Sequence, residues 1–338
     1  MPFFMPKRSI REVKRYKGWL TWGARAGTHL EGRQMLTTFV QQVINGLMLG
    51  GSYALIAIGY TLIFGVLNLL HLAHGEVAMI GSYVGLTLVL TAMSQFGVLP
   101  IWMVLIGAMI GTGIVGIVVE LIAFRPLGRK QLHITPLITT IAVAFVLQEA
   151  AIKIFGSEQR SFPIHMFNEL KQYDLQFGSF KLTFVQMFII GASLVLMVGL
   201  YFFVEKTKMG KAMRACAENT LTARLLGVNV HRVTVWTFGI SSALAGAAGV
   251  LIGLAYNITP LMGVTLGLKG LTIMLFGGSG NILGAMVAAL ILGMIETMSV
   301  AYLVPAWKDG FAFGILILIL LYKPSGLFGS RLQIEAGR

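Results

Sequence analysis

Residues 46–67 read GLMLGGSYALIAIGYTLIFGVL, residues 68–76 read NLLHLAHGE, and residues 77–90 read VAMIGSYVGLTLVL. The first and last of these runs are almost wholly apolar, and three ionisable side chains stand between them. A helix needs about 20 mostly apolar residues to cross the hydrocarbon core of a bilayer. This part of the chain therefore predicts membrane-spanning helices with a polar interruption between them.

The composition of the whole chain indicates the same class. Of its 338 residues, 56% are hydrophobic and 12% are charged, and the mean hydropathy is +0.81. Soluble domains are about 45–50% apolar and about 25% charged. These values exclude an ordinary soluble enzyme, a disordered chain and a nucleic-acid-binding domain. We expect an all-α polytopic membrane protein.

Hydrophobic runs from residue 36 onward predict the membrane spans. We expect eight to ten transmembrane helices, with broken or re-entrant segments among them, because the first run is long enough for one span and a second piece. The candidate segments are 36–70, 72–93, 98–124, 134–155, 183–204, 234–256, 264–280, 281–303 and 307–322.

The net charge of +13 predicts the orientation of these spans. The turn at 125–130 has three basic residues and no acid, and the segment 205–233 has six basic residues against two acids. The loop at 156–182 has three of each. Cytoplasmic loops collect Lys and Arg, so we expect 125–130 and 205–233 in the cytoplasm and 156–182 on the other side.

The same rule predicts that both termini are cytoplasmic. Residues 1–34 hold eight basic and two acidic side chains, a net charge of +6. We divide the chain into this basic N-terminal arm, a transmembrane domain over 35–325 with the cytoplasmic loop 205–233, and a cytoplasmic tail over 326–338. The arm suits a surface of anionic lipid. In a second interpretation it is an extension with little function, because a compact sequence begins at Met35.

This topology requires an even number of crossings before residue 125. Counting 36–70, 72–93 and 98–124 once each gives three. Either the first segment crosses twice, or a piece of chain near 60–80 is re-entrant.

The polar interruption lies within the segment 60–80, where the number of crossings is ambiguous. Asn68, His71, His74 and Glu76 stand between the two apolar runs. Ionisable groups at membrane depth are costly and usually face a cavity or the protein interior. We favour a broken helix that lines a solute path over a solvated turn at the membrane surface. A metal site of two His and one Glu is a minor alternative, because no further ligand is in sight.

A second unusual stretch runs from Gly263 to Gly284, and it holds Lys269 within an apolar run. A lysine there needs a partner or an aqueous cavity. Glu296, Glu149 and Glu76 are candidate partners, and snorkelling to the membrane surface is the alternative. The glycines at 277–284 do not form a Walker A motif, which occurs nowhere in the chain. They predict a tight turn.

The loop at 205–233 predicts a short amphipathic helix after Gly210. Met213, Ala217, Leu221 and Leu225 would follow one side of it, and Gly227 would end it. Such a helix between two spans can dock in a groove of a partner, although an ordinary basic loop would also satisfy the topology. The small residues of 234–256 predict close helix packing. The single cysteine, Cys216, excludes an internal disulfide.

Several motifs together resemble a known family, the LivH-type permease subunits of branched-chain amino acid ABC transporters. The similar strings are GLMLGGSYALIAIGY at 46–60, AHGEV at 73–77, GSY at 81–83, MG at 209–210, RACAE at 214–218, LGV at 226–228, GGSG at 277–280, GA at 284–285, LG at 292–293 and Glu296. The similarity covers about 36–330 and is specific only in combination. One departure is His71, where the family commonly has Asn.

The resemblance implies an importer in the bacterial inner membrane. Its expected partners are a second permease subunit, two cytoplasmic ATPases and an extracytoplasmic solute-binding protein, besides the lipid bilayer and without nucleic acid. This chain would not be an enzyme and would hold no cofactor or metal, because ATP and Mg belong to the ATPases. The resemblance assigns coupling to the ATPase to Gly210, Arg214, Ala215, Glu218 and Gly227.

The expected function is therefore ATP-driven import of branched-chain or related amino acids through alternating access. Candidate residues of the translocation path are Asn68, His71, His74, Glu76, Lys269 and Glu296. One alternative is a permease of the same family for urea or short amides. Another is an ion-coupled secondary transporter in which the histidines, Glu76 and Lys269 relay protons.

Overall fold

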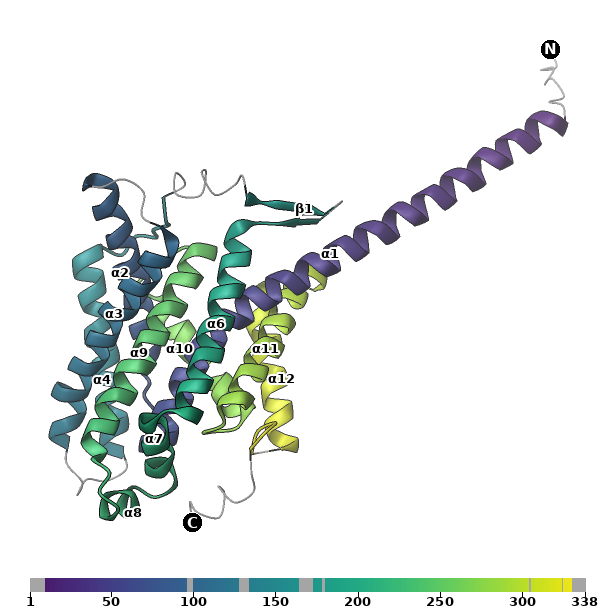
Figure 1. The fold of residues 1–338 in the computed structure, drawn as a ribbon. Coiled ribbons are helices and arrows are strands. Elements are labelled where there is room, and N and C mark those ends of the chain that lie inside the picture. Colours follow the sequence, from purple (N-terminus) through teal and green to yellow (C-terminus); the bar gives the residue numbers. More distant parts are fainter. Residues whose placement is uncertain are drawn as a thin grey trace.

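The computed structural model describes residues 10–95, 100–127, 134–163, 173–177, 180–303, 305–323 and 325–329, and before residue 35 it describes the backbone alone. Hydrophobic helices make up nearly all of the described chain and stand side by side in one bundle (Figure 1). Seven helical segments are long and apolar enough to cross a membrane. The all-α membrane fold predicted from the composition is confirmed.

The long helices are α1 (Ile10–Leu67), α2 (His74–Gln95), α3 (Ile101–Val119), α4 (Ile134–Phe155), α6 (Phe184–Lys206), α9 (Val230–Ala255) and α11 (Ile282–Tyr302). Two shorter apolar helices are α10 (Met262–Gly277) and α12 (Lys308–Tyr322). A π-helical turn, η1 (Glu120–Phe124), and a 3-10 turn, η2 (Arg125–Leu127), follow α3, and another 3-10 turn, η4 (Pro305–Trp307), precedes α12.

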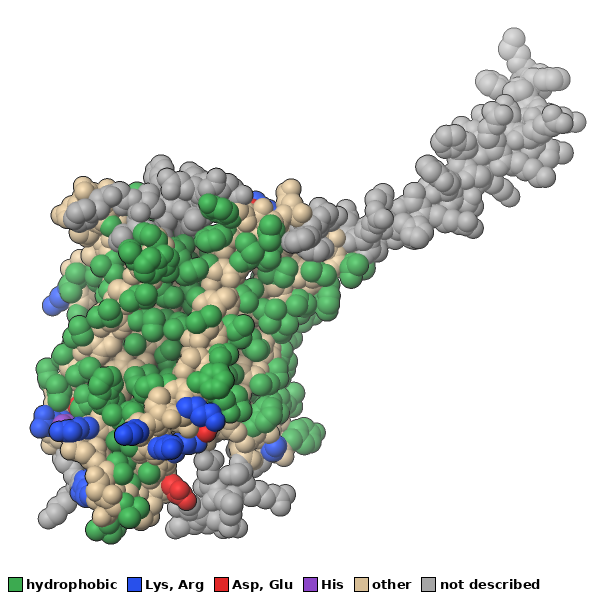
Figure 2. Space-filling view, viewed as in Figure 1, with side chains coloured by type: hydrophobic (Ala, Val, Ile, Leu, Met, Phe, Trp, Pro, Cys, Tyr) green, Lys and Arg blue, Asp and Glu red, His purple; other side chains and the backbone are tan. Residues whose placement is uncertain are grey.

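The two ends of the bundle carry different short elements (Figure 1). At the hairpin end, β1 (Leu175–Phe177) pairs antiparallel with β2 (Phe180–Leu182), with Gln176 opposite Lys181. At the α8 end lie α7 (Lys208–Glu218) and α8 (Thr220–Leu225). Figure 2 shows Lys and Arg side chains gathered toward the α8 end, below a broad hydrophobic belt. The positive-inside rule assigns that end to the cytoplasm.

Helix α1 crosses the bundle once, from the hairpin end to the α8 end. Gln186, in the first turn of α6 after the hairpin, donates a hydrogen bond of 2.8 Å to Asn45 Oδ1. At the other end of α1, Val66 packs with Met213 and Cys216 of α7. The possibility that the segment 36–70 crosses twice is therefore excluded.

Three helices, α1, α2 and α3, precede residue 125, so the even number of crossings that the charges predicted is wrong. Met35 lies at the hairpin end, whereas Phe328 lies at the α8 end, where its N–H donates to the carbonyl of Gly277 at 3.2 Å. The described chain thus enters and leaves the bundle at opposite ends. The side chains of the arm and residues 330–338 lie outside the described residues, so the cytoplasmic location of both termini stays a prediction.

The centre of the bundle consists of α1 and α9. In the most hydrophobic windows of their spans, 83% and 78% of the residues are buried, against 11% in α4. Glycines permit this packing. Gly249 of α9 lies so close to the carbonyl of Ala78 that a Cβ would overlap it, and Gly246 lies equally close to Thr112 of α3. The prediction of close packing along 234–256 is confirmed.

Candidate functional site

The first interruption of the helices lies between α1 and α2. Asn68 follows the last residue of α1 and has a positive φ of 52°. The chain then turns back into the bundle, because the ring of His74 lies against Gly59, two turns before the end of α1. The N–H of His74 donates to the carbonyl of His71 at 3.0 Å as α2 begins. The predicted broken helix is present, and its final part is buried.

His71 occupies an aromatic cage. Its ring centroid lies 5.4 Å from that of Phe124, 5.2 Å from that of Phe238 and 5.9 Å from that of His74. The side chain is 1% exposed, and neither ring nitrogen has a hydrogen-bond partner among the described residues. Burying a charged imidazole in such a cage would be costly. The cage therefore favours a neutral ring.

The second interruption lies between α9 and α10. Ile258 pairs with Arg160 through two backbone hydrogen bonds of 2.7 and 2.9 Å, which fixes the connection beside the segment that follows α4. Helix α10 then begins at Met262, and its N-cap residue, Leu261, makes no side-chain hydrogen bond to the first turn. Both interrupted connections thus lead into helices whose first turns hold a buried glycine, Gly75 in α2 and Gly263 in α10.

These two first turns pack against each other. A Cβ on Gly75 of α2 would overlap the carbonyl of Gly263 and would lie 2.5 Å from Gly267 Cα. The carboxylate of Glu76 lies against Gly263, at the N-terminus of α10. Glu76 is 2% exposed, and its Oε2 has no hydrogen-bond partner among the described residues. The sequence motif AHGE at 73–76 is thus placed directly on the first turn of α10.

A buried ionic cluster joins α1, α10, α11 and α12. Lys269 Nζ lies 2.7 Å from Glu296 Oε1 and 2.9 Å from Asp309 Oδ1. Tyr53 Oη accepts a hydrogen bond of 2.9 Å from Lys269 and donates one of 3.1 Å to Glu296 Oε2. Glu296 is therefore the partner of Lys269, rather than Glu149 or Glu76. Snorkelling to the membrane surface is excluded, because the lysine is 3% exposed.

The loop at 205–233 contains two helices instead of the single amphipathic helix that we expected. Asn219 ends α7 and caps α8, because its Oδ1 accepts a hydrogen bond of 2.9 Å from the N–H of Thr222. The expected stripe is consequently split. Met213 is buried against the bundle, whereas Leu221 and Leu225 are 67% and 79% exposed.

Helix α7 is fixed firmly to the bundle. The hydroxyl of Thr207 accepts a hydrogen bond of 3.0 Å from the N–H of Gly210, and a Cβ on Gly210 would overlap the backbone of Val204. Arg214 forms an ion pair of 2.6 Å with Glu205 Oε2 and a hydrogen bond of 3.2 Å to the Glu205 carbonyl. Of the other predicted coupling residues, Ala215 is partly buried and Glu218 and Gly227 are exposed.

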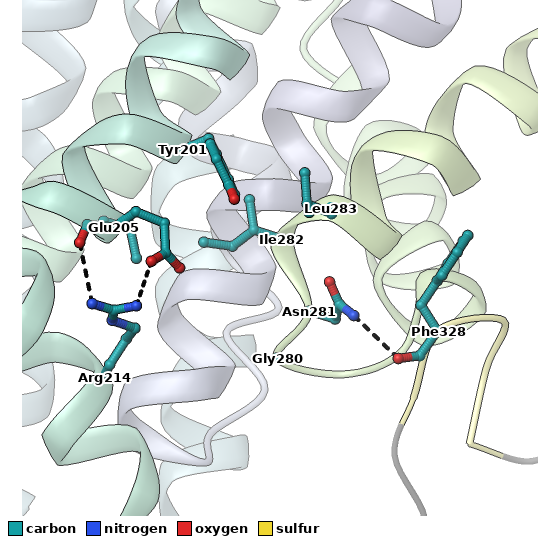
Figure 3. A pocket seen from close by; sticks show the side chains of 9 residues that line it. Tyr201, Glu205, Arg214, Gly280, Asn281, Ile282, Leu283 and Phe328 are labelled. Atoms are coloured by element: carbon teal, nitrogen blue, oxygen red, sulfur yellow. Dashed lines mark hydrogen bonds and ion pairs between the residues drawn. The ribbon is translucent and has the colours of Figure 1, made fainter.

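A cavity of about 360 Å³ lies beside this ion pair. Figure 3 shows Glu205 and Arg214 on one side of it, and Asn281 with Phe328 on the other. Asn281 Nδ2 donates a hydrogen bond of 3.1 Å to the carbonyl of Phe328. The predicted tight turn at 277–284 therefore meets the chain that follows α12. The remaining lining residues are Tyr201, Val204, Gly280, Ile282 and Leu283.

The structure thus divides the six predicted path residues into two groups. Asn68, His71, His74 and Glu76 surround the first interruption, whereas Lys269 and Glu296 belong to the ionic cluster. Asp309 and the tyrosine hydroxyls of Tyr53 and Tyr60 were not predicted from the sequence, although both tyrosines stand in the run at 46–60. The ring of Tyr60 packs edge-on against His74, with centroids 4.8 Å apart. No group of three metal-ligating side chains occurs in the described part of the chain.

A bundle of apolar helices, with two interruptions in its interior and a basic helix pair at one end, defines a polytopic membrane permease. The sequence profile of the branched-chain amino acid transport system permease component matches residues 42–320, and the chain belongs to this family. It is accordingly a multi-pass protein of the bacterial inner membrane and a permease subunit of the ABC transporter type.

Individual relatives agree with this assignment. The permease protein BraD of Pseudomonas aeruginosa is 36% identical over 301 residues, which are 88% of this chain and 97% of the relative. The permease proteins LivH of Salmonella typhimurium and of Escherichia coli are 39% and 38% identical over 302 residues, with the same shares covered. All three are named as permeases of high-affinity branched-chain amino acid transport systems.

Proposed function

We propose that this chain moves branched-chain amino acids across the inner membrane as one of two permease subunits in an ATP-driven importer. A binding protein on the hairpin side hands over the solute, and two ATPases on the α8 side hydrolyse ATP with Mg. The family match over residues 42–320 carries this proposal. The names of the high-coverage relatives support the substrate class.

The contact with the ATPase is assigned to α8 and the end of α7. Leu221, Leu225 and Leu226 are 67%, 79% and 79% exposed at the basic end of the bundle. Exposed leucines on a short helix are suited to an apolar groove of a partner. Gly210 and Arg214 hold α7 against the bundle beneath them, and Glu218 and Gly227 flank the leucines. Motion of the ATPase would therefore reach α6 and α1 through α7.

The solute path is assigned to the first interruption, lined by His71, His74 and Glu76, with Asn68 as the residue that turns the chain. Irregular backbone at membrane depth is tolerated where it is buried in protein or lines a cavity. Lys269 and Glu296 neutralise each other within the ionic cluster. We therefore assign them a structural role beside the path rather than a proton relay.

This assignment makes the two alternatives less favourable. Proton coupling needs groups that exchange protons along a chain, but His71 is caged by two phenylalanines. A urea or amide permease would share the fold, but the high-coverage relatives named above are permeases for branched-chain amino acids.

The test is uptake of labelled leucine into proteoliposomes that contain the chain with its partner permease, its ATPases and its binding protein. We expect uptake that requires ATP, binding protein and a competent ATPase. The double variant Leu225→Asp/Leu226→Asp should abolish it and should release the ATPase on gel filtration. Thr222→Asp, also exposed on α8, serves as the matched charge control and should leave the ATPase bound. Uptake that persists without the ATPase and collapses with a protonophore would contradict the proposal.

A further inference from the structure

Glu76 is a buried carboxylate for which the fold itself gives no counter-ion. Its side chain is 2% exposed, and none of the ion pairs among the described residues includes it. The contrast with Glu296 is informative, because that carboxylate, buried to nearly the same degree, contacts a lysine and a tyrosine hydroxyl. Leaving a carboxylate unpaired in the interior is costly. Such a group indicates a ligand that supplies the missing positive charge.

The surroundings of Glu76 define what that ligand must carry. The carboxylate lies against Gly263 in the first turn of α10, and Gly75 of α2 packs on the same turn. The first N–H groups of a helix have no partner within the helix, and together they carry partial positive charge. Leu261 at the N-cap of α10 makes no side-chain hydrogen bond to them. Glycines at 75, 263 and 267 carry no side chains, so the two turns meet backbone against backbone.

The junction therefore presents donors and an acceptor side by side. Helix N-termini bind carboxylates, and a buried carboxylate binds an ammonium group through charge-assisted hydrogen bonds. An α-amino acid carries its carboxylate and its ammonium on one carbon atom. Urea and simple amides carry neither charge.

We propose that the junction of α2 and α10 binds the charged end of the transported amino acid. The N–H groups at the start of α10 hold the carboxylate, and Glu76 holds the ammonium. The side chain of Glu76, which lies at the N-terminus of α10 in the structure, moves aside as the solute carboxylate takes that position. This inference rests on the proposed function and assigns its solute site to named groups.

The first experiment compares Glu76→Gln with the wild type in the reconstituted importer, with labelled leucine on its binding protein as the probe. Loss of a buried charge partner predicts a fall in the maximal uptake rate of about 30-fold or more. The concentration of loaded binding protein that gives half-maximal uptake should stay unchanged, because the hairpin face is untouched. ATP hydrolysis stimulated by that protein should persist. Glu76→Asp, which keeps the charge, should recover part of the uptake.

The matched control is Glu120→Gln. Glu120 is another buried glutamate, 2% exposed, but it lies in η1 beside His231 at 3.8 Å. Its uptake should remain within about twofold of the wild type, because Glu120 lies outside the junction of α2 and α10. Equal loss in both variants would show that burial of a carboxylate matters for the fold alone and would overturn the assignment.

A second measurement does not depend on uptake. In a Cys216→Ser background, Glu76→Cys should react with a small cationic methanethiosulfonate reagent, and leucine-loaded binding protein should slow that reaction. Absence of any reaction, or a rate that leucine does not change, would overturn the site. If Glu76→Gln loses ATPase stimulation as well as uptake, the variant is impaired beyond solute binding. The labelling experiment then determines whether the solute occupies the junction.

The two proposals fail in different ways. A wild-type importer that takes up no leucine with ATP would refute the proposed function. A wild type that works beside a Glu76→Gln variant with normal leucine uptake would refute only the site.

Discussion

Lys269 and Glu296 form an ion pair of 2.7 Å in the interior of the bundle, and both side chains are 4% exposed. They come from the two helices on either side of the glycine-rich turn at 277–281. A third charge, Asp309 at the start of α12, lies 2.9 Å from the same ammonium group. The cluster therefore joins the last three helices to Tyr53 of α1.

The first prediction concerns this pair. Lys269→Met removes one charge and leaves Glu296 buried with only the half-exposed Lys308 at 3.8 Å. This should cost about 3 kcal/mol of folding free energy, the low end of the range for a broken buried pair. The double variant Lys269→Met/Glu296→Gln should recover much of that loss, because no uncompensated charge remains. Thermal unfolding in detergent measures both. A single variant as stable as the wild type would show that the pair contributes nothing.

Asp309→Asn is the graded control for that experiment. Its side chain is 43% exposed, so solvent screens its charge. We expect a loss of about 0–1 kcal/mol, the range of exposed ion pairs.

The second prediction concerns the contact of α2 with α9. Gly249→Val should destabilise the bundle by about 1–3 kcal/mol through overpacking, because even a Cβ at this position overlaps the carbonyl of Ala78. The hydrogen bond of 2.7 Å from Ser82 Oγ to the Gly249 carbonyl would be strained as well. Resistance to proteolysis in detergent is a suitable measure.

A glycine on the periphery provides the comparison. A Cβ added to Gly191 of α6 would meet open space, with no neighbouring side chain or helix within 4 Å. Gly191→Ala should be neutral or stabilising by up to about 1 kcal/mol, because alanine is the better helix former. If both substitutions destabilised equally, packing at Gly249 would not be the cause.

The third prediction concerns Arg214 and Glu205. Arg214→Ala and Glu205→Gln should impair uptake to the same degree, and the double variant should be no worse, because either change removes the same ion pair between α7 and α6. The pair itself is half-exposed and contributes about 0.2–1 kcal/mol. The measurement is leucine uptake per ATP hydrolysed. Glu218→Ala, on the exposed end of α7, should lower this ratio independently, so its effect should add to that of Arg214→Ala.

The fourth prediction concerns Cys216, which faces Val66 and Met213 beneath α7 and is 2% exposed. Burial raises the pKa of its thiol. A raised pKa lowers the thiolate fraction at a given pH, so maleimide should react slowly at pH 7. The rate should rise about tenfold per pH unit until the thiol titrates. Rapid labelling of the folded protein at pH 7 would show that α7 leaves the bundle.

The helices themselves were largely predictable, since hydrophobic length carries most of the information. The segment predicted at 134–155 coincides with α4, and that at 281–303 differs from α11 by one residue at each end. The break after Asn68 was also predictable, because Asn, two His and a Glu cannot remain in lipid without partners. The break between α7 and α8 at Asn219 was predictable as well, because Asn is favoured at the N-cap of a new helix.

The partner of Lys269 could not be chosen from the sequence. Glu76, Glu149 and Glu296 were all acceptable, and only the packing of α10 against α11 selects the last. Asp309 gave no signal, because it stands at the start of a span, where acidic residues are common. Charge counting did not predict the three helices before residue 125, because it assumed one side for the arm and for the turn at 125–130.

The last prediction concerns the backbone of Asn68. Its φ of 52° lies in the left-handed region, which Asn and Gly tolerate and which β-branched residues strongly disfavour. Asn68→Gly should therefore be close to neutral, whereas Asn68→Val should cost about 1–3 kcal/mol. The hydrogen bond of 2.7 Å from the N–H of Asn68 to the Phe64 carbonyl is a backbone contact, which both variants keep. Thermal unfolding measures the cost, and leucine uptake shows whether the returning segment still places His74 and Glu76. Equal stability of the glycine and valine variants would contradict the strained turn.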